Sequence, residues 1–181
     1  MIYTHHYDSP LGGITLSAQE DALTGCWFDG QKYFGAALKE PYANGPLPVF
    51  DEADRWLDIY FSGHEPDFLP PLSLQSTPFR MAVWEILLTI PYGKTMTYGA
   101  IAEIMAKQKE IPNMSAQAVG GAVGHNPISL MIPCHRVIGT DGSLTGYAGG
   151  LERKMQLLAL EQVDLSVFPV PRKQKTRSKA E

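Results

Sequence analysis

The sequence has few cysteines and no long apolar run. Its 181 residues include two cysteines, Cys26 and Cys134, and no stretch of eighteen or more apolar residues of the kind that spans a membrane. The opening residues, MIYTHHYDSPLGG, lack both the basic and the apolar region of a signal peptide. We therefore expect a soluble, cytoplasmic protein with no membrane partner, in which both thiols stay reduced because that compartment is reducing.

Metal-binding patterns and internal repeats are missing as well. The histidines and cysteines are scattered, without a C-x-x-C or H-x-x-x-H spacing, whereas a structural zinc site needs four closely spaced ligands. We predict no metal site. With 44% hydrophobic and 19% charged residues, the chain has the composition of one or two globular domains.

Charge is distributed unevenly along the chain. Residues 1–77 carry 3 Lys or Arg and 11 Asp or Glu, a net −8, whereas residues 78–181 carry 12 and 8, a net +4, which together give the overall −4. The second half is thus the one suited to meet a polyanion. Five of its basic residues lie in the final PRKQKTRSKAE, so composition alone supports nucleic-acid binding only weakly.

The first half has the pattern of strands followed by a helix. Three short β-type runs, at 2–7, 13–18 and 23–28, are separated by segments of turn composition. Apolar residues at helical spacing predict a helix over about 50–62, with Asp51 in the N-cap region and Gly63 at its end. A proline-rich connector follows, and we place the domain boundary after residue 77.

The second half is predicted to be mainly helical. A helix starts at the Thr-Pro pair at 77–78, and two more start with Thr97 and Ser115 as N-caps. The last two, joined by QKEIPNM, resemble a helix-turn-helix with a long turn. The basic tail, 169–181, lacks apolar periodicity and is expected to be disordered.

The helix that follows Ser115 is unusual because nearly all its side chains are small. Its sequence, AQAVGGAVG, has three glycines, and each interior glycine costs about 1 kcal/mol relative to alanine in a helix. Two explanations remain open. The glycines could allow close helix packing, or the helix backbone could press into a narrow groove such as the minor groove of DNA.

Cys134 stands next to His135 in an apolar run. A cysteine thiol at its ordinary pKa is only a few per cent thiolate at neutral pH, so a nucleophilic cysteine needs a base or a positive environment. In an extended chain, neighbouring side chains point to opposite faces, and the two residues cooperate only if the chain bends there, which Pro133 favours. The alternative is a buried structural thiol beside an unrelated histidine.

The longer string settles this choice by resemblance. IPCHRVIG, followed by GSLTGYAGGLERKMQLLALE, resembles the O6-alkylguanine-DNA alkyltransferases, and the likeness runs from about Phe79 to Glu161. DSPLGGITL and WFDGQKYF near the start are more loosely similar to bacterial members. The resemblance implies an α+β protein with an N-terminal α/β domain (1–77) containing an antiparallel, RNase H-like sheet, and a mainly helical, winged-helix-like DNA-binding domain (78–168).

The resemblance also implies a reaction and four catalytic residues. Cys134 matches the thiol that takes the alkyl group from O6-alkylguanine, or less readily from O4-alkylthymine, and keeps it, so that each molecule reacts once and needs no cofactor. His135 matches a general base that acts through a water, and Glu161 matches the carboxylate that orients it. Tyr98 matches a tyrosine that rotates the nucleotide's phosphate and gives its proton towards N3 of the leaving guanine.

Four further residues match the family's substrate pocket. Asn126 matches an asparagine that holds the active-site turn, and the backbone carbonyl of Val137 is expected to accept from the guanine amino group. Tyr147 and Ala148 match the loop that walls the alkyl site. Arg136 is expected to be structural.

The resemblance implies that the partner is double-stranded DNA containing O6-alkylguanine. We expect the protein to be a monomer. The small-residue helix would enter the minor groove, through Ser115, Ala118 and Gly121, while the damaged base leaves the stack. Gln117 stands where the family often has an arginine finger that fills the gap, and it lacks the cation and the reach of arginine.

Three other functions fit parts of the sequence. One is a lesion-recognition protein that does not react, although such proteins lack the acceptor cysteine. Another is a cysteine hydrolase that uses Cys134, His135 and Glu161 and turns over. The third is a regulatory DNA-binding module in which these three residues are incidental. Cys26 is expected to be a buried small hydrophobe in all of them.

Overall fold

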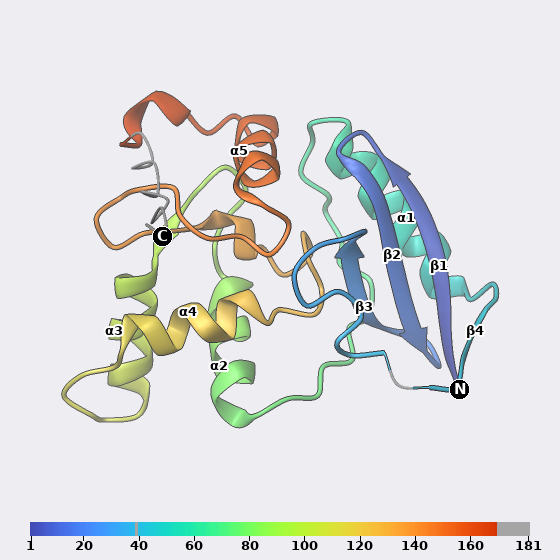
Figure 1. Ribbon diagram of the computed structural model, residues 1–181, viewed down its shortest axis with the longest axis horizontal. Helices are drawn as coiled ribbons and strands as arrows, with labels where there is room; N and C mark the ends of the chain where they lie inside the picture. Colours follow the sequence, from blue (N-terminus) through green and yellow to red (C-terminus); the bar gives the residue numbers. More distant parts are fainter. Residues whose placement is uncertain (39, 170–181) are drawn as a thin grey trace, which may run out of the picture.

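The structure is a computed structural model that describes residues 1–38 and 40–169. Apart from residue 169, the tail predicted to be disordered lies outside the described residues. The chain forms two parts side by side, a twisted sheet with one helix and a group of helices and loops (Figure 1). The predicted α+β class is confirmed.

Three strands form the predicted meander. β1 (Ile2–Ser9), β2 (Gly12–Gln19) and β3 (Ala22–Phe28) pair in antiparallel fashion. In β2, Ile14 and Leu16 are fully buried, the alternation expected of a strand with one covered face. A short fourth strand that was not predicted, β4 (Tyr42–Asn44), runs parallel to β1 and completes the order β3-β2-β1-β4.

α1 (Pro48–Phe61) packs against this sheet (Figure 1). Asp51, predicted in the N-cap region, lies in the first turn of the helix, and the N-cap position itself is held by Leu47, which makes no side-chain hydrogen bond. Pro48 explains the earlier start, since a proline at the first helical position already has the helical φ and needs no partner for its nitrogen. Gly63, at φ +86°, follows the helix and suits its end, as predicted.

The outer edge of β3 pairs with the helical part. Cys26 donates its N–H to the carbonyl of Pro127 at 2.9 Å and accepts from the N–H of Ser129, also at 2.9 Å. These bonds satisfy backbone groups that a strand edge would otherwise leave exposed. They also hold the segment that leads to Cys134 against the sheet.

The second part is mostly helical, as predicted. α2 (Pro78–Leu87), α3 (Tyr98–Gln108) and α4 (Ala116–Gly124) pack against one another. The predicted caps of α3 and α4 are confirmed, because the hydroxyls of Thr97 and Ser115 each accept a hydrogen bond from the N–H three residues further on.

Short elements complete the helical part. β5 (Met96–Thr97) and β6 (Val137–Ile138) form a parallel pair, which places the start of α3 beside the 3-10 turn η1 (Cys134–Arg136). α5 (Leu151–Leu160) and η2 (Leu165–Val167) follow.

One hydrophobic core runs through both parts. Buried residues of the sheet and α1 form a continuous cluster with those of α2, α3 and α4 and of the segment 128–134. A smaller cluster beneath α5 joins Ile138, Leu144 and Leu158. The turn that carries Cys134 therefore lies at the seam between the two parts. None of the described helices is long and apolar enough to cross a membrane.

Candidate active site

A closed turn presents Cys134. Asn126 is buried at the start of this turn, where its Nδ2 donates to the carbonyl of Ile132 at 2.8 Å and its Oδ1 accepts from the N–H of Ile128 at 3.0 Å. These two bonds tie the segment to itself before it reaches the cysteine. The predicted bend at the Cys-His pair is confirmed, because η1 begins at Cys134.

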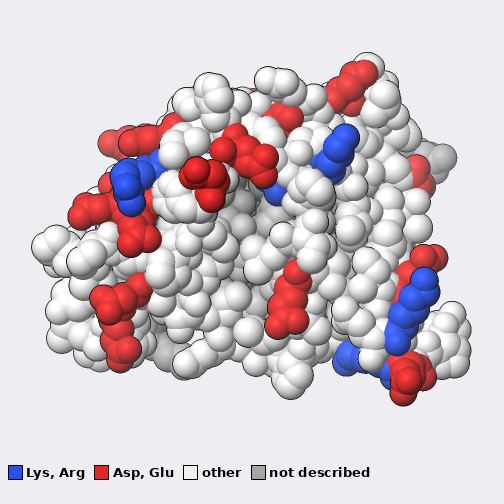
Figure 2. All heavy atoms as spheres, turned by 180° about the vertical axis from the view of Figure 1, so that it is seen from behind, with Lys and Arg blue, Asp and Glu red and all other residues white. Residues whose placement is uncertain are grey.

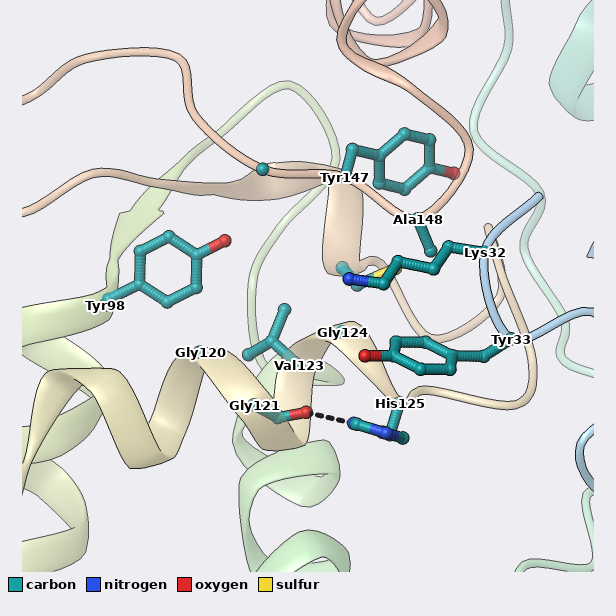
Figure 3. A pocket seen from close by; sticks show the side chains of 12 residues that line it. Lys32, Tyr33, Tyr98, Gly120, Gly121, Val123, Gly124, His125, Tyr147 and Ala148 are labelled. Carbon is teal, nitrogen blue, oxygen red and sulfur yellow. Dashed lines mark hydrogen bonds between the residues drawn. The ribbon is translucent and has the colours of Figure 1, made fainter. Parts of the chain in front are cut away.

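Cys134 lines a cavity of about 350 Å³. Figure 3 labels other residues that line it. The residue is 6% exposed, and this cavity gives access to the thiol. Tyr98, at the N-terminus of α3, and the loop that carries Tyr147 and Ala148 form two of its sides. Gly121 and other residues at the end of α4 form a third side. The volume lies in the range of small-molecule sites.

His135 and Glu161 form a buried pair behind the cysteine. Nε2 of His135 lies 2.6 Å from Oε1 of Glu161, and both side chains are fully excluded from solvent. Nε2 is therefore the protonated nitrogen that donates to the carboxylate, which makes Nδ1 the basic nitrogen. Nδ1 is buried and has no hydrogen-bond partner among the residues that the structure describes. This arrangement suits a histidine that takes a proton through Nδ1.

The carboxylate of Glu161 accepts hydrogen bonds from several parts of the chain. Besides His135, Arg136 donates from Nε at 2.9 Å and from Nη2 at 3.0 Å, Tyr60 donates its hydroxyl at 2.8 Å, and Gly93 donates its N–H at 3.0 Å. Burial alone would raise the pKa of Glu161, but the hydrogen bonds and charges of His135 and Arg136 outweigh it and lower this pKa to about 2. The structural role expected of Arg136 is confirmed.

The pKa values of the thiol and the imidazole are both shifted by burial. Burial raises the pKa of Cys134, opposed by the Asn126 side chain, the charge of Lys154 and backbone N–H groups. Burial also lowers the pKa of His135, against the opposing effect of Glu161. The thiol is thus protonated at neutral pH and the imidazole is neutral, so the pair is poised for general-base chemistry.

Lys154 was not predicted from the sequence, where it looks like an ordinary lysine on the surface of α5. It is fully buried, and its ammonium donates to the carbonyl of Val137 and to those of Thr145 and Gly146, at 2.9 and 3.0 Å. Burial lowers its pKa to about 8. Lys154 thus ties β6 to the pocket loop, residues 145–148. The Val137 carbonyl, which is expected to bind the guanine amino group, already accepts a hydrogen bond from Lys154.

Tyr98 is half-buried between α4 and the pocket loop. A Cβ atom at Gly120 would lie 3.8 Å from its ring, and one at Gly146 would lie 3.6 Å from its hydroxyl. Burial, and secondarily Cys134, raise its pKa to about 12. The hydroxyl therefore keeps its proton at neutral pH and points into the cavity as a donor (Figure 3).

The four residues predicted to meet DNA lie on the exposed side of α4. These are Ser115, Gln117, Ala118 and Gly121. Added Cβ atoms at Gly121 and Gly124 would meet nothing within 4 Å, and one at Gly120 would make only an ordinary contact. Packing within the described part of the chain therefore does not require these glycines.

A loop of the sheet-containing part forms the fourth side of the cavity, which the sequence did not predict. The Lys32 N–H donates to the carbonyl of Ala148 at 3.0 Å, and the Tyr33 ring stacks on His125 with 4.0 Å between centroids. His125 in turn bonds the carbonyl of Gly121 through Nδ1 at 2.7 Å. Figure 3 shows Lys32 and Tyr33 pointing across the cavity towards Tyr98.

The described residues form no cluster of metal ligands. In the ranges 1–38 and 40–169, no three His, Cys, Asp or Glu side chains gather closely enough to hold a metal ion. Figure 2 shows the side of the molecule that faces away from the viewer in Figure 1. On this side, acidic side chains are spread widely and basic ones lie in small groups. α4 lies towards the viewer in Figure 1, away from this acidic side.

Two protein-family models match the chain. Residues 2–74 match the ribonuclease-like domain of 6-O-methylguanine DNA methyltransferase, and residues 78–163 match the DNA-binding domain of the same protein.

Several curated proteins are similar over nearly their whole length. The methylated-DNA–protein-cysteine methyltransferase of Mycobacterium leprae is 45% identical over 165 residues, 90% of this chain and 93% of the relative. The protein of the same name from Mycobacterium tuberculosis is 43% identical over 175 residues, 93% of this chain and 99% of the relative.

Solved structures agree with the sequence comparisons. The crystal structure of Mycobacterium tuberculosis O6-methylguanine methyltransferase superimposes with a TM-score of 0.74 at 42% identity, covering 90% of this chain and 93% of the other. The complex of the Mycobacterium tuberculosis protein OGT with DNA gives a TM-score of 0.77 at 42% identity, covering 88% and 92%.

Proposed function

Because this chain belongs to the methylated-DNA–protein-cysteine methyltransferase family, we propose that it repairs DNA by moving the alkyl group of O6-alkylguanine, or less readily of O4-alkylthymine, to its own Cys134. The observation that carries this proposal is the thiol at the wall of a cavity, directly beside a buried pair of His135 and Glu161. A nucleophile, a base and a group that orients the base are the parts that such a transfer needs.

The transfer begins with removal of the thiol proton. Nδ1 of His135 takes this proton through a water, and Glu161 stabilises the imidazolium that forms while keeping its own charge. The thiolate of Cys134 then attacks the alkyl carbon in an SN2 step, in which the S–C bond forms as the C–O6 bond breaks. Tyr98 gives a proton towards N3, so guanine leaves as a neutral base rather than an anion.

The pocket residues bind the base and the alkyl group. Tyr147 and Ala148 wall the alkyl site, and backbone N–H groups of their loop bind O6. Asn126 holds the turn that aims the thiol. The Val137 carbonyl accepts from the guanine amino group with its second lone pair, since Lys154 uses the first.

DNA enters along α4. The small side chains of α4 let the helix backbone approach the minor groove, and the exposed residues Ser115, Ala118 and Gly121 lie on that side. Gln117 fills the gap that the extruded nucleotide leaves. The crystal structure of the OGT relative with DNA supports DNA as the partner.

The protein acts once, as a monomer, and needs no cofactor. The product is an S-alkylcysteine, and nothing in the proposed chemistry removes the alkyl group. Residues 1–77 form the N-terminal α/β domain, and residues 78–168 form the domain that holds DNA and the acceptor.

Intact-mass spectrometry tests the proposal. The protein is incubated with a duplex that contains one O6-methylguanine, beside a Cys134→Ser control. We expect the mass of one methyl group to be gained, to map to the peptide with Cys134, and to saturate at one per protein. Binding without a mass gain would instead indicate lesion recognition, and repeated turnover by unmodified protein would indicate a hydrolase.

A further inference from the structure

Tyr60 reaches the His135–Glu161 pair from the other part of the molecule. It lies on α1, is fully buried, and donates its hydroxyl to Oε1 of Glu161 at 2.8 Å. The same hydroxyl oxygen lies 3.3 Å from Nε2 of His135. A residue of the N-terminal part therefore touches both members of the pair that serves Cys134.

The position of this hydroxyl is fixed by packing. The Tyr60 ring stacks on Trp56 of the same helix, with 5.3 Å between centroids and 8° between planes. It meets His135 edge-on, with 6.2 Å between centroids and 73° between planes. Burial, and secondarily the charge of Glu161, raise the pKa of Tyr60 well above its ordinary value. The hydroxyl therefore keeps its proton at neutral and acidic pH and remains a hydrogen-bond donor.

Three donors share Oε1 of Glu161. His135 approaches it through Nε2 at 2.6 Å, Tyr60 through its hydroxyl at 2.8 Å and Arg136 through Nη2 at 3.0 Å. A donor that binds a carboxylate oxygen lowers the affinity of that oxygen for a proton and fixes its direction. The proton on Nε2 therefore stays on the imidazole, and Nδ1 remains the nitrogen that faces the reaction.

We propose that Tyr60 is a positioning residue of the alkyl transfer, which holds Oε1 of Glu161 in place and limits how strongly that oxygen attracts the proton of His135. This inference rests on the proposed function and deepens it. It gives the N-terminal part a direct role in the chemistry of Cys134, through one hydrogen bond across the seam.

Several other groups act on the same imidazole and carboxylate. The charges of Arg136 and Lys154 act on His135, and Tyr92 lies near Glu161 and Arg136. Tyr147 is a further titratable neighbour of Tyr60, and Cys134 acts in turn on Tyr147. Replacing Tyr60 by phenylalanine leaves all of them in place and removes a single hydroxyl.

The test is the pH dependence of the single-turnover rate of methyl transfer in Tyr60→Phe. Without the hydroxyl, Oε1 attracts the imidazole proton more strongly and stabilises the imidazolium, so the acid limb of the profile moves to higher pH. The plateau rate falls by about three- to tenfold, as expected from one lost hydrogen bond to a charged group. An acid limb at the wild-type pH would overturn the proposal, whatever the plateau.

Tyr7→Phe is the matched control. It removes another tyrosine–carboxylate hydrogen bond to α1, the 2.6 Å contact of the Tyr7 hydroxyl with Asp58, which is exposed. Its profile should coincide with the wild type. A displacement equal to that of Tyr60→Phe would assign the effect to α1 stability and overturn the proposal.

A second substitution covers the case in which Tyr60→Phe does not fold. 3-Fluorotyrosine at position 60 keeps the ring and the hydroxyl but donates a stronger hydrogen bond, so the acid limb should move to lower pH. No displacement, or one to higher pH, would overturn the proposal. Failure of the proposed function is distinct, because the wild-type protein would then gain no methyl group at any pH.

Discussion

Oε1 of Glu161 lies 2.6 Å from Nε2 of His135, although 25 residues separate them in the sequence. The contact brings the end of α5 against η1, so the residue that follows the cysteine is held by a different element. The burial of this pair determines its protonation state. Both groups are shielded from water, and burial keeps the imidazole neutral while donors keep the carboxylate charged.

Removing the charge of Glu161 should destabilise the fold. Glu161→Gln leaves the buried guanidinium of Arg136 without its counter-charge, which costs about 3–5 kcal/mol. Urea denaturation measures the loss. Glu152→Gln, an exposed acid in the first turn of α5, is the control and should change stability by less than about 0.5 kcal/mol. Equal stability of the two variants would contradict the structural role of the ion pair.

Acid should weaken the wild-type protein through the same carboxyl group. Its pKa is about 2 in the folded protein against 4.5 ordinarily, so its contribution to stability is complete above about pH 5 and is lost as the pH falls from 4.5 through 2. The contribution is about 3 kcal/mol. Urea denaturation at several pH values measures the free energy of unfolding, and in Glu161→Gln its fall between pH 4.5 and 2 should be smaller by this amount. The same fall in the variant and the wild type would contradict the prediction.

Lys154 should help the thiol to ionise. Its positive charge lowers the pKa of Cys134, so Lys154→Met should raise that pKa and slow alkylation by iodoacetamide about three- to tenfold at neutral pH. The measurement is the alkylation rate as a function of pH on protein checked for folding by circular dichroism. Lys107→Met, on the exposed side of α3, is the control. Identical profiles for both variants would rule out an electrostatic role.

A glycine at position 121 should strengthen binding to DNA at the expense of fold stability. An added Cβ atom meets nothing within the protein, so Gly121→Ala should raise the free energy of unfolding by about 0.5–1 kcal/mol. The same methyl group should weaken binding to duplex DNA, because it holds the helix backbone away from the groove. Denaturation and fluorescence anisotropy measure the two effects. Unweakened binding in both Gly121→Ala and the bulkier Gly121→Leu would remove α4 from the interface.

Gln117 should limit DNA affinity. Gln117→Arg adds a cation on the exposed side of α4, so binding should tighten and the slope of log affinity against log salt should steepen by about one. Gln156→Arg, an exposed site on α5, carries the same change of charge away from α4. If both variants steepen the slope equally, the gain reflects net charge and not the position of residue 117.

The sequence alone was sufficient for the features that depend on neighbouring residues. The strands of the meander, the caps Thr97 and Ser115 and the bend at the Cys-His pair follow from local hydrogen bonds and backbone preferences, and all are observed. The proline-cysteine-histidine-arginine string carried the family resemblance for the same reason, since its residues are adjacent. Asp51 lies in the first turn and not at the cap itself, because Pro48 starts the helix earlier than predicted.

Only the tertiary structure decided which distant groups meet. Nothing in the local sequence marks Tyr60 or Lys154, because a tyrosine on the apolar face of a helix and a lysine among charged neighbours have ordinary patterns. Both are buried polar groups whose partners come from other elements, Glu161 for the first and three backbone carbonyls for the second. A buried donor needs an acceptor, but the sequence does not say which one packing will bring within reach.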